Sequence, residues 1–182
     1  MLMPTQKALR VTLGQHSLAK SGAVNQDFHG AMLPEGTLRM SKGIAVALAD
    51  GIGSSRVSQV ASAAAVRGFL DDYYATSDAW SVRRAAQRVL NATNSWLHAQ
   101  TMRSDARFDK DSGYVCTFSA LVFKSTTAHL FHAGDSRVYR VAGHALEAVE
   151  AGGNAGNVRR AGKVGVGRLV ERLVVVCEIA AL

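Results

Sequence analysis

The sequence predicts an α+β domain built on antiparallel β-sheet, because stretches with strand periodicity flank two consecutive stretches with helical periodicity. The two helical stretches follow each other without an intervening strand, unlike the alternating order of a doubly wound α/β unit. A chain of 182 residues, 48% of them hydrophobic, can bury one core of this kind. We therefore expect a sheet with two helices packed as an antiparallel pair on one face.

Three segments ahead of the helices have strand character. Residues 8–14 alternate between apolar and polar side chains, and residues 28–33 form a second short run after a polar loop. Residues 34–36 predict a turn. Residues 44–49 are continuously apolar, which predicts a strand that is buried on both faces.

Apolar and small side chains at spacings of three and four predict a helix over residues 55–74. Its small side chains favour close packing against a sheet. Residues 76–78, with the sequence Thr-Ser-Asp, supply capping groups for a second helix over residues 79–101. The short break between the two helices predicts that they pack side by side.

Strand patterns return after a charged loop. We expect strands over residues 115–123, 128–133 and 138–141, and the polar segments 125–127 and 134–136 predict hairpin turns between them. This set completes the order of strands, two helices and strands.

The character of the chain changes near residue 150. Residues 151–157 are glycine-rich and predict a flexible segment, and residues 150–182 contain neither aspartate nor an aromatic residue. Residues 164–182 are apolar with scattered charges, a pattern that leaves helix and strand open. We therefore divide the chain into a domain over residues 8–149 and a tail of unassigned role over residues 150–182.

The formal net charge of +7 raises the question of an anionic partner. The basic residues are scattered along the sequence and no nucleic-acid-binding motif is present, so we favour attraction for anionic substrates over nucleic-acid binding. No uncharged apolar run reaches the roughly 18 residues of a membrane span, and we expect no membrane partner.

The first eleven residues include basic side chains but lack the apolar segment of a secretory signal, which predicts a cytoplasmic location. Cys116 and Cys177 lie in apolar stretches without metal-ligand spacing. We expect both to be buried free thiols.

Three aspartates near the ends of predicted strands carry the candidate chemistry. Asp50 and Gly51 directly follow the buried run, Asp27 lies in a turn-like segment upstream, and Asp135 lies in a polar turn downstream. Hard divalent cations prefer oxygen ligands, and a glycine lets the backbone turn sharply and expose its own carbonyl. The set indicates a divalent-metal enzyme, whereas each aspartate alone would also fit an ordinary turn. For Asp135, closing a turn and holding a metal remain equal alternatives.

The order of the motifs resembles that of the metal-dependent serine/threonine protein phosphatases of the 2C type, also called PPM-type. The likeness is greatest to the phosphatase part of bacterial bifunctional proteins that also contain a protein kinase domain, and it covers residues 8–149. The motifs are Asn25-Gln26-Asp27, Ala49-Asp50-Gly51-Ile52-Gly53, Cys116-Thr117 and Gly134-Asp135-Ser136-Arg137-Val138-Tyr139.

The resemblance implies an antiparallel β-sandwich flanked by helix pairs, with two Mn²⁺ or Mg²⁺ ions at one end. It implies that Asp27 and Asp50 are catalytic carboxylate ligands, with Asp50 bridging the ions and the Gly51 carbonyl completing one coordination sphere. Asp135 matches a position that helps to hold an additional, weaker metal. The implied reaction is hydrolysis of phosphoserine or phosphothreonine on a protein substrate, and the bifunctional relatives imply a protein kinase as a further partner.

The resemblance ends near Val149. The family carries two further metal-binding aspartates downstream, whereas this chain has no aspartate after Asp135. We therefore expect a domain truncated on its C-terminal side by a frameshift or premature end, with an incomplete dinuclear site that binds metal weakly. The alternative hypothesis is a non-catalytic remnant or binding module.

Overall fold

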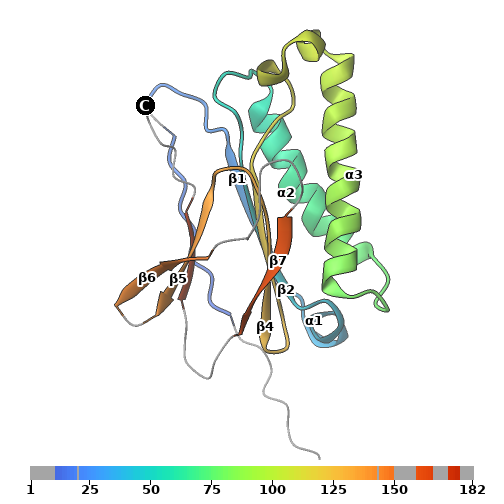
Figure 1. Ribbon diagram of the computed structural model, residues 1–182, viewed down its shortest axis with the longest axis vertical. Helices are drawn as coiled ribbons and strands as arrows, with labels where there is room; N and C mark the ends of the chain where they lie inside the picture. Colours follow the sequence, from blue (N-terminus) through green and yellow to red (C-terminus); the bar gives the residue numbers. More distant parts are fainter. Residues whose placement is uncertain (1–10, 20, 143, 150–158, 166–171, 177–182) are drawn as a thin grey trace, which may run out of the picture.

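The computed structural model describes residues 11–19, 21–142, 144–149, 159–165 and 172–176, which form two antiparallel sheets and a pair of long helices (Figure 1). The larger sheet has the order β1-β2-β3-β4-β7, and its strands are β1 (Asp27–Met32), β2 (Ile44–Asp50), β3 (Phe118–Lys124), β4 (Thr127–Ala133) and β7 (Arg159–Gly165). The smaller sheet has the order β6-β5-β8, and its strands are β5 (Arg137–Ala142), β6 (Ala145–Ala148) and β8 (Arg172–Val176). The predicted α+β class is confirmed.

The two long helices lie next to each other against the larger sheet, as the sequence predicts. They are α2 (Ser58–Ala75) and α3 (Val82–Arg103). Two short 3₁₀ turns, η1 (Asp105–Phe108) and η2 (Lys110–Ser112), connect α3 to β3. No helix in the described part of the chain combines the length and the apolar character that a membrane crossing requires.

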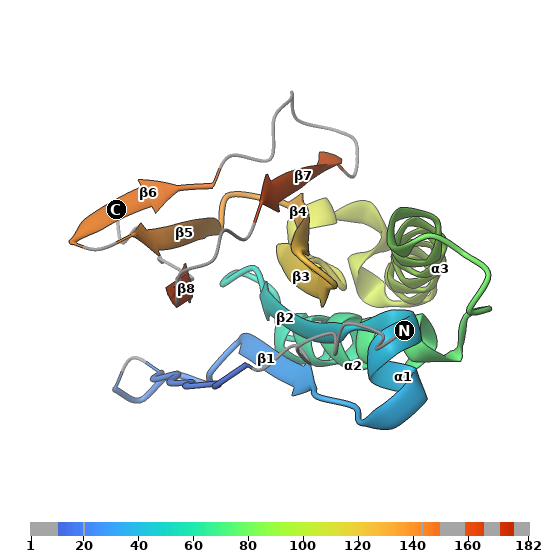
Figure 2. The ribbon, with the colours of Figure 1, turned by 90° about the horizontal axis from the view of Figure 1, so that it is seen from below.

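The main core lies between the larger sheet and the helices. Ala45, Ala47 and Ala49 of β2 are at most 4% exposed and share this face, because alternate residues of a strand point the same way. Their small side chains let α2 approach closely. Phe69 of α2 fills the space and packs edge-on against Phe118, with 5.3 Å between ring centroids. Figure 2 shows the helices on one side of the larger sheet and the smaller sheet on the other.

A second, smaller core joins the two sheets. Leu121, Leu130 and Val138 are each at most 3% exposed, and Val46 and Phe123 pack against them. Val138 belongs to β5, whereas the other four side chains come from the larger sheet. The two sheets therefore form a sandwich, with the helices covering one outer face.

The hairpin predicted at residues 134–136 is wrong, because β4 and β5 belong to different sheets. Gly134 has a φ of +109°, a conformation that L side chains rarely adopt. A Cβ atom at this position would also lie 2.7 Å from the Cβ of Thr117. The segment therefore makes a tight, glycine-dependent crossing from one layer of the sandwich to the other.

The structure also differs from the sequence-based expectation in the first half of the chain. The strand predicted over residues 8–14 is wrong for residues 11–14, which have no regular secondary structure in the described part. A helix that the pattern did not predict, α1 (Gly36–Lys42), follows the predicted turn.

Strands β7 and β8 come from the segment beyond residue 150. Strand β7 pairs antiparallel with β4, and β8 pairs antiparallel with β5. The glycine-rich segment at residues 151–157, whose flexibility was an expectation, lies outside the described residues.

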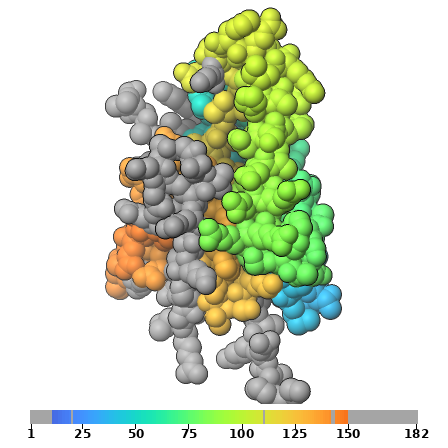
Figure 3. All heavy atoms as spheres, turned by 45° about the vertical axis from the view of Figure 1, so that its right-hand side comes forward, coloured from blue at the N-terminus to red at the C-terminus, as the bar shows by residue number. Residues whose placement is uncertain are grey.

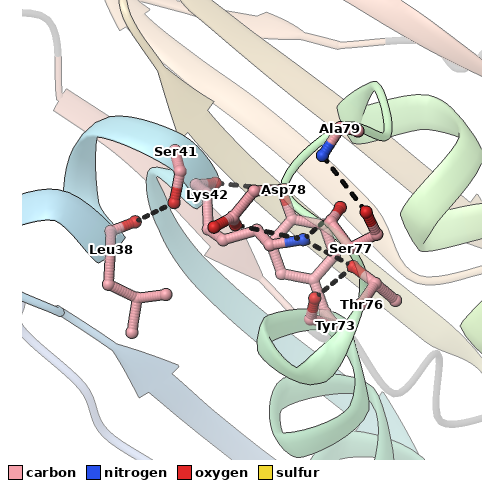
Figure 4. Close-up of polar contacts among 8 residues, drawn as sticks. All are labelled: Leu38, Ser41, Lys42, Tyr73, Thr76, Ser77, Asp78 and Ala79. Carbon is pink, nitrogen blue, oxygen red and sulfur yellow. Dashed lines mark hydrogen bonds and ion pairs between the residues drawn. The ribbon is translucent and has the colours of Figure 1, made fainter.

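A buried lysine fastens α1 to the turn between the long helices (Figure 4). Lys42 is 2% exposed, and its Nζ donates hydrogen bonds to Oγ1 of Thr76 at 2.7 Å and to the carbonyl oxygen of Ser77 at 2.9 Å. The Asp78 carboxylate lies 3.8 Å from the same Nζ. Burial lowers the pKa of Lys42, and the charge of Asp78 opposes that shift.

We expect Lys42→Met to destabilise the protein by about 1–2 kcal/mol, because it removes two part-buried hydrogen bonds, to Oγ1 of Thr76 and to the carbonyl oxygen of Ser77. Asp78→Asn is the matched control. Its side chain is 68% exposed, so the ion pair should contribute at most about 0.5 kcal/mol. Urea unfolding gives the free energy of unfolding of both variants. Equal losses of stability would show that the ion pair with Asp78 contributes more than the two hydrogen bonds of Lys42.

Candidate metal centre

The two sheet aspartates that the sequence singled out are cross-strand neighbours. Asp27 is the first residue of β1 and Asp50 the last residue of β2, and the register pairs them directly. Cross-strand partners point to the same face of a sheet. Ala49 faces the helices, so Asp50 and Asp27 point to the opposite face, on the side of the smaller sheet.

The side chains of Asp27 and Asp50 lie in an environment that is unfavourable for two negative charges. Burial, a side-chain hydrogen bond with Asp27 and the negative charges of Asp27 and Asp135 raise the pKa of Asp50 to about 6. Oδ1 of Asp27 is buried and has no hydrogen-bond partner among the described residues. A cation between these carboxylates would relieve both conditions, so the pair has the chemistry of a seat for a hard divalent ion.

Gly51 lies where the backbone leaves the sheet and passes beneath the start of α2. Its N–H donates to the carbonyl oxygen of Gln26 at 3.1 Å. Its own carbonyl receives no hydrogen bond within the described part of the chain. A Cβ at this position would lie 2.7 Å from both Cβ and the carbonyl oxygen of Ser58. Only glycine fits here without displacing α2, and its carbonyl oxygen is a candidate further ligand beside Asp50.

Thr117, at the entrance to β3, holds Asp50 from the other side. Its N–H donates to the Asp50 carbonyl oxygen at 2.7 Å, and its Oγ1 accepts from the Asp50 N–H at 3.2 Å. The same Oγ1 lies 2.7 Å from Oγ of Ser136, which is 5% exposed. Thr117 thus connects the end of β2 to the crossing segment that carries Asp135.

The structure brings the predicted site residues together to different degrees. Asp27, Asp50 and Gly51 are neighbours, while Asp135 is exposed and acts on Asp50 through its charge. Within the described residues, no group of three or more His, Cys, Asp or Glu side chains is arranged to hold a metal. The assignment of Asp135 as a ligand stays a prediction.

The profile of the family described as protein phosphatase 2C matches residues 15–158, most of the chain. The chain belongs to the protein phosphatase 2C family. No curated protein matches this family member in sequence.

Solved phosphatase structures share the fold of this protein phosphatase 2C family member. A variant of a bacterial serine phosphatase aligns with a TM-score of 0.56 and 16% identity, over 85% of this chain and 65% of that protein. The Mycobacterium tuberculosis serine/threonine phosphatase PstP/Ppp aligns with a TM-score of 0.54 and 16% identity, over 90% of this chain and 70% of that protein. The chain thus spans just under two thirds of the bacterial serine phosphatase.

The catalytic domain of the phosphatase PstP, solved in complex with two manganese ions, is also similar. It aligns with a TM-score of 0.52 and 20% identity, over 90% of this chain and 69% of that domain. At these identities the likeness establishes the fold, and the roles of individual residues rest on the geometry of this chain.

Sequence reasoning assigned no contacts to Ser136, which lies against Thr117 at the candidate metal centre of this protein phosphatase 2C family member, or to His132 near the end of β4. Ser136 was quoted only as part of a motif, and His132 was not assigned. His132 lies between Oγ of Ser119, 2.8 Å from its Nδ1, and the carbonyl oxygen of Gly134, 3.0 Å from its Nε2. Spacing along the chain could not reveal the Ser119 contact, because it joins two different strands, β3 and β4.

Cys116 is a half-buried free thiol beside this centre. Burial, with the nearby charge of Asp50, raises its pKa to about 12, so it is not a thiolate ligand at neutral pH. The predicted free thiol is confirmed for Cys116, while Cys177 lies outside the described residues.

Thr117→Val is expected to cost about 1–2 kcal/mol of stability, because the Asp50 N–H and the Ser136 hydroxyl lose a shared partner in a half-buried place. Thr117→Ser keeps the hydroxyl and should remain within about 1 kcal/mol of the wild type. Chemical unfolding of the two variants gives the comparison. A serine variant as unstable as the valine variant would assign the effect to the lost methyl group.

Proposed function

We propose that this chain is a serine/threonine protein phosphatase that hydrolyses phosphoserine and phosphothreonine on protein substrates with the help of Mn²⁺ or Mg²⁺. The observation that carries the proposal is the pair Asp27 and Asp50, two crowded carboxylates with an unsatisfied buried oxygen, in a member of the protein phosphatase 2C family.

The residues present fit a divalent metal at this position. Asp27 and Asp50 would contribute carboxylate oxygens and Gly51 its carbonyl, while Asp135 would assist a further, weaker ion. Bound divalent ions would offset charge on the phosphoryl group and supply a water acidic enough to attack phosphorus near neutral pH.

The chain's own contribution is to hold these oxygens in place. Asp50 is fixed by two backbone contacts with Thr117, and Gly51 by its hydrogen bond to Gln26. With a pKa of about 6, the metal-free Asp50 is mostly ionised above neutral pH, where its carboxylate is available as a ligand. At pH 5 it is mostly protonated, so metal-dependent activity should require neutral or alkaline conditions.

Phosphate release from a phosphothreonine peptide in millimolar Mn²⁺ tests the proposal, with Asp50→Ala as the control variant. We expect turnover by the wild type, loss on chelation by EDTA, and loss in Asp50→Ala. Turnover by Asp50→Ala would show that Asp50 does not hold a metal ion that the reaction needs.

A second candidate function is a phosphoprotein-binding module without turnover. It is favoured by the lack of a third metal-ligating side chain at the pair among the described residues. Calorimetric binding of the same phosphopeptide without phosphate release, in Mn²⁺, would favour this function over catalysis.

The proposed partners follow from the proposed reaction. The substrate is a phosphorylated protein, and a serine/threonine protein kinase is the partner that supplies it. We propose a cytoplasmic location, where both would be present. Co-purification of a kinase whose phosphorylated product the chain dephosphorylates is the corresponding test.

A further inference from the structure

The outward side of α3 carries a cluster of arginines that the proposed reaction does not use. A shallow hollow of about 380 Å³ lies along the first three turns of the helix (Figure 3 shows α3 uncovered along this side). We call it the α3 arginine surface, and its lining consists of Ser81, Arg83, Arg84, Gln87, Arg88 and Asn91.

The positive charge of this surface is not neutralised by the protein. Helix α3 contains no Asp or Glu in its 22 residues. In the described part of the chain, no carboxylate forms an ion pair with Arg83, Arg84 or Arg88. Arg84 instead stacks over the Trp80 ring, with 4.9 Å from its Cζ to the ring centroid. The three side chains are exposed and available to an outside anion.

The placement of these arginines works against the stability of α3. Ser81 is the N-cap, so Arg83 and Arg84 lie in the first turn, where the helix macrodipole disfavours cations. Arg84 and Arg88 are spaced i, i+4, so two like charges are neighbours on one face. A bound anion would relieve both effects. Binding of a negatively charged ligand would therefore account for arginines at positions that are unfavourable in the free protein.

We propose that the α3 arginine surface docks an acidic segment of a partner protein. The planar guanidinium group pairs with carboxylates through two parallel hydrogen bonds, which gives arginine an advantage over lysine in such contacts. The lining from Ser81 to Asn91 spans about 15 Å of helix, the reach of four or five extended peptide residues.

The same features disfavour the other anionic macromolecules. A nucleic-acid site needs a longer row of cations or aromatic platforms for bases, and Trp80 is already occupied by Arg84. A membrane-binding helix presents apolar side chains beside its basic ones, whereas Ser81, Gln87 and Asn91 complete this lining.

The proposed surface is separate from the candidate metal centre. Helix α3 begins next to the contact of Lys42 with Ser77, at the end of β2 opposite to Asp50. Its other end contacts the segment that precedes β3, where Tyr114 N–H donates to Thr101 Oγ1. Docking on the first turns would leave the metal centre open, and the inference does not depend on phosphatase activity.

Fluorescence anisotropy with a labelled glutamate-rich peptide of about ten residues, long enough to span the hollow, tests the proposal. The variant is the double substitution Arg83→Gln and Arg88→Gln, which keeps the Arg84–Trp80 stacking. We expect it to weaken peptide binding on the order of tenfold, about the effect of losing one good charged contact. The wild-type affinity should fall steeply with salt.

Arg103→Gln is the matched control, because Arg103 is exposed in the last turn of the same helix. It should leave peptide binding unchanged. The melting temperatures separate binding from structure. Removing Arg83 from the first turn and Arg88 from beside Arg84 should leave the melting temperature equal or higher, whereas Arg103→Gln should lower it slightly.

Equal peptide affinity in the wild type and the double variant would overturn the proposal, as would a clear loss of melting temperature in the double variant. Tighter binding of single-stranded DNA or of vesicles rich in phosphatidylserine, lost with the same two arginines, would assign the surface to another class of partner and would also overturn it.

Discussion

Replacing Asp50 with asparagine is expected to abolish Mn²⁺ binding and, at the same time, to make the metal-free protein more stable at neutral pH. Both effects have one cause, the negative charge of Asp50, which is partly buried and lies beside the Asp27 carboxylate where β1 begins and β2 ends. An amide removes the cost of burying this charge and its repulsion with Asp27, and with it the negative charge that a divalent ion needs.

The pH dependence of the stability of the metal-free protein follows from the direction of the pKa shift of Asp50. The pKa of Asp50 is about 6 in the folded protein and about 3.9 in an unfolded chain. Below pH 4 the group is protonated in both states and costs no stability. Between pH 4 and pH 6 the unfolded chain ionises while the folded protein still holds the proton, so the metal-free wild type loses stability over this range, and the loss is complete above pH 6. Because Asp50 is partly exposed, solvent screening limits this loss to about 1 kcal/mol.

Calorimetric titration with MnCl₂ and thermal melts in EDTA between pH 4 and pH 8 measure the two effects. The control is Asp71→Asn, which changes an exposed carboxylate on α2 and should alter neither. Wild-type Mn²⁺ affinity in Asp50→Asn, or a melting curve that follows the wild type at every pH, would contradict the interpretation of the pair as a metal seat.

The sequence predicted the elements of this site better than their arrangement. The apolar run before Asp50 was enough to place that carboxylate at a strand end. The direct pairing of Asp27 with Asp50 could not be predicted, because it depends on a register between two strands separated by α1. A shift of one residue would have sent Asp27 to the helix face.

The errors have a common physical origin in non-local contacts. A polar turn with glycine at residue 134 has the same sequence pattern whether the next strand pairs locally or crosses to another sheet. The close packing of Gly134 on Thr117, which the pattern does not contain, favours the crossing. Helix α1 was missed because it is short and is held by the buried contacts of Lys42 with the α2–α3 turn. Strands β7 and β8 depend on free edges of β4 and β5, which periodicity cannot reveal.

Gly51→Ala is expected to cost about 2–3 kcal/mol of stability, in the range of an overpacked core. The added methyl group would lie 2.7–2.8 Å from three atoms of Ser58, including its backbone carbonyl, and Ser58 is fully buried at the start of α2. Relief requires a shift of the first turn of α2 or of Gly51 itself. Because α2 is anchored by Phe69 in the main core, much of the displacement should fall on Gly51.

Gly53→Ala is the matched control, since a Cβ at that exposed position meets only Oε1 of Gln26, at 3.7 Å, and should cost under about 1 kcal/mol. Urea unfolding gives the stability of both variants, and Mn²⁺ titration shows whether the Gly51 carbonyl has moved. A loss of metal affinity in Gly51→Ala but not in Gly53→Ala would connect the fit of the backbone beneath α2 to the metal seat. Unchanged metal affinity together with lost stability would contradict the expected displacement of Gly51 and would mean that the first turn of α2 shifts instead.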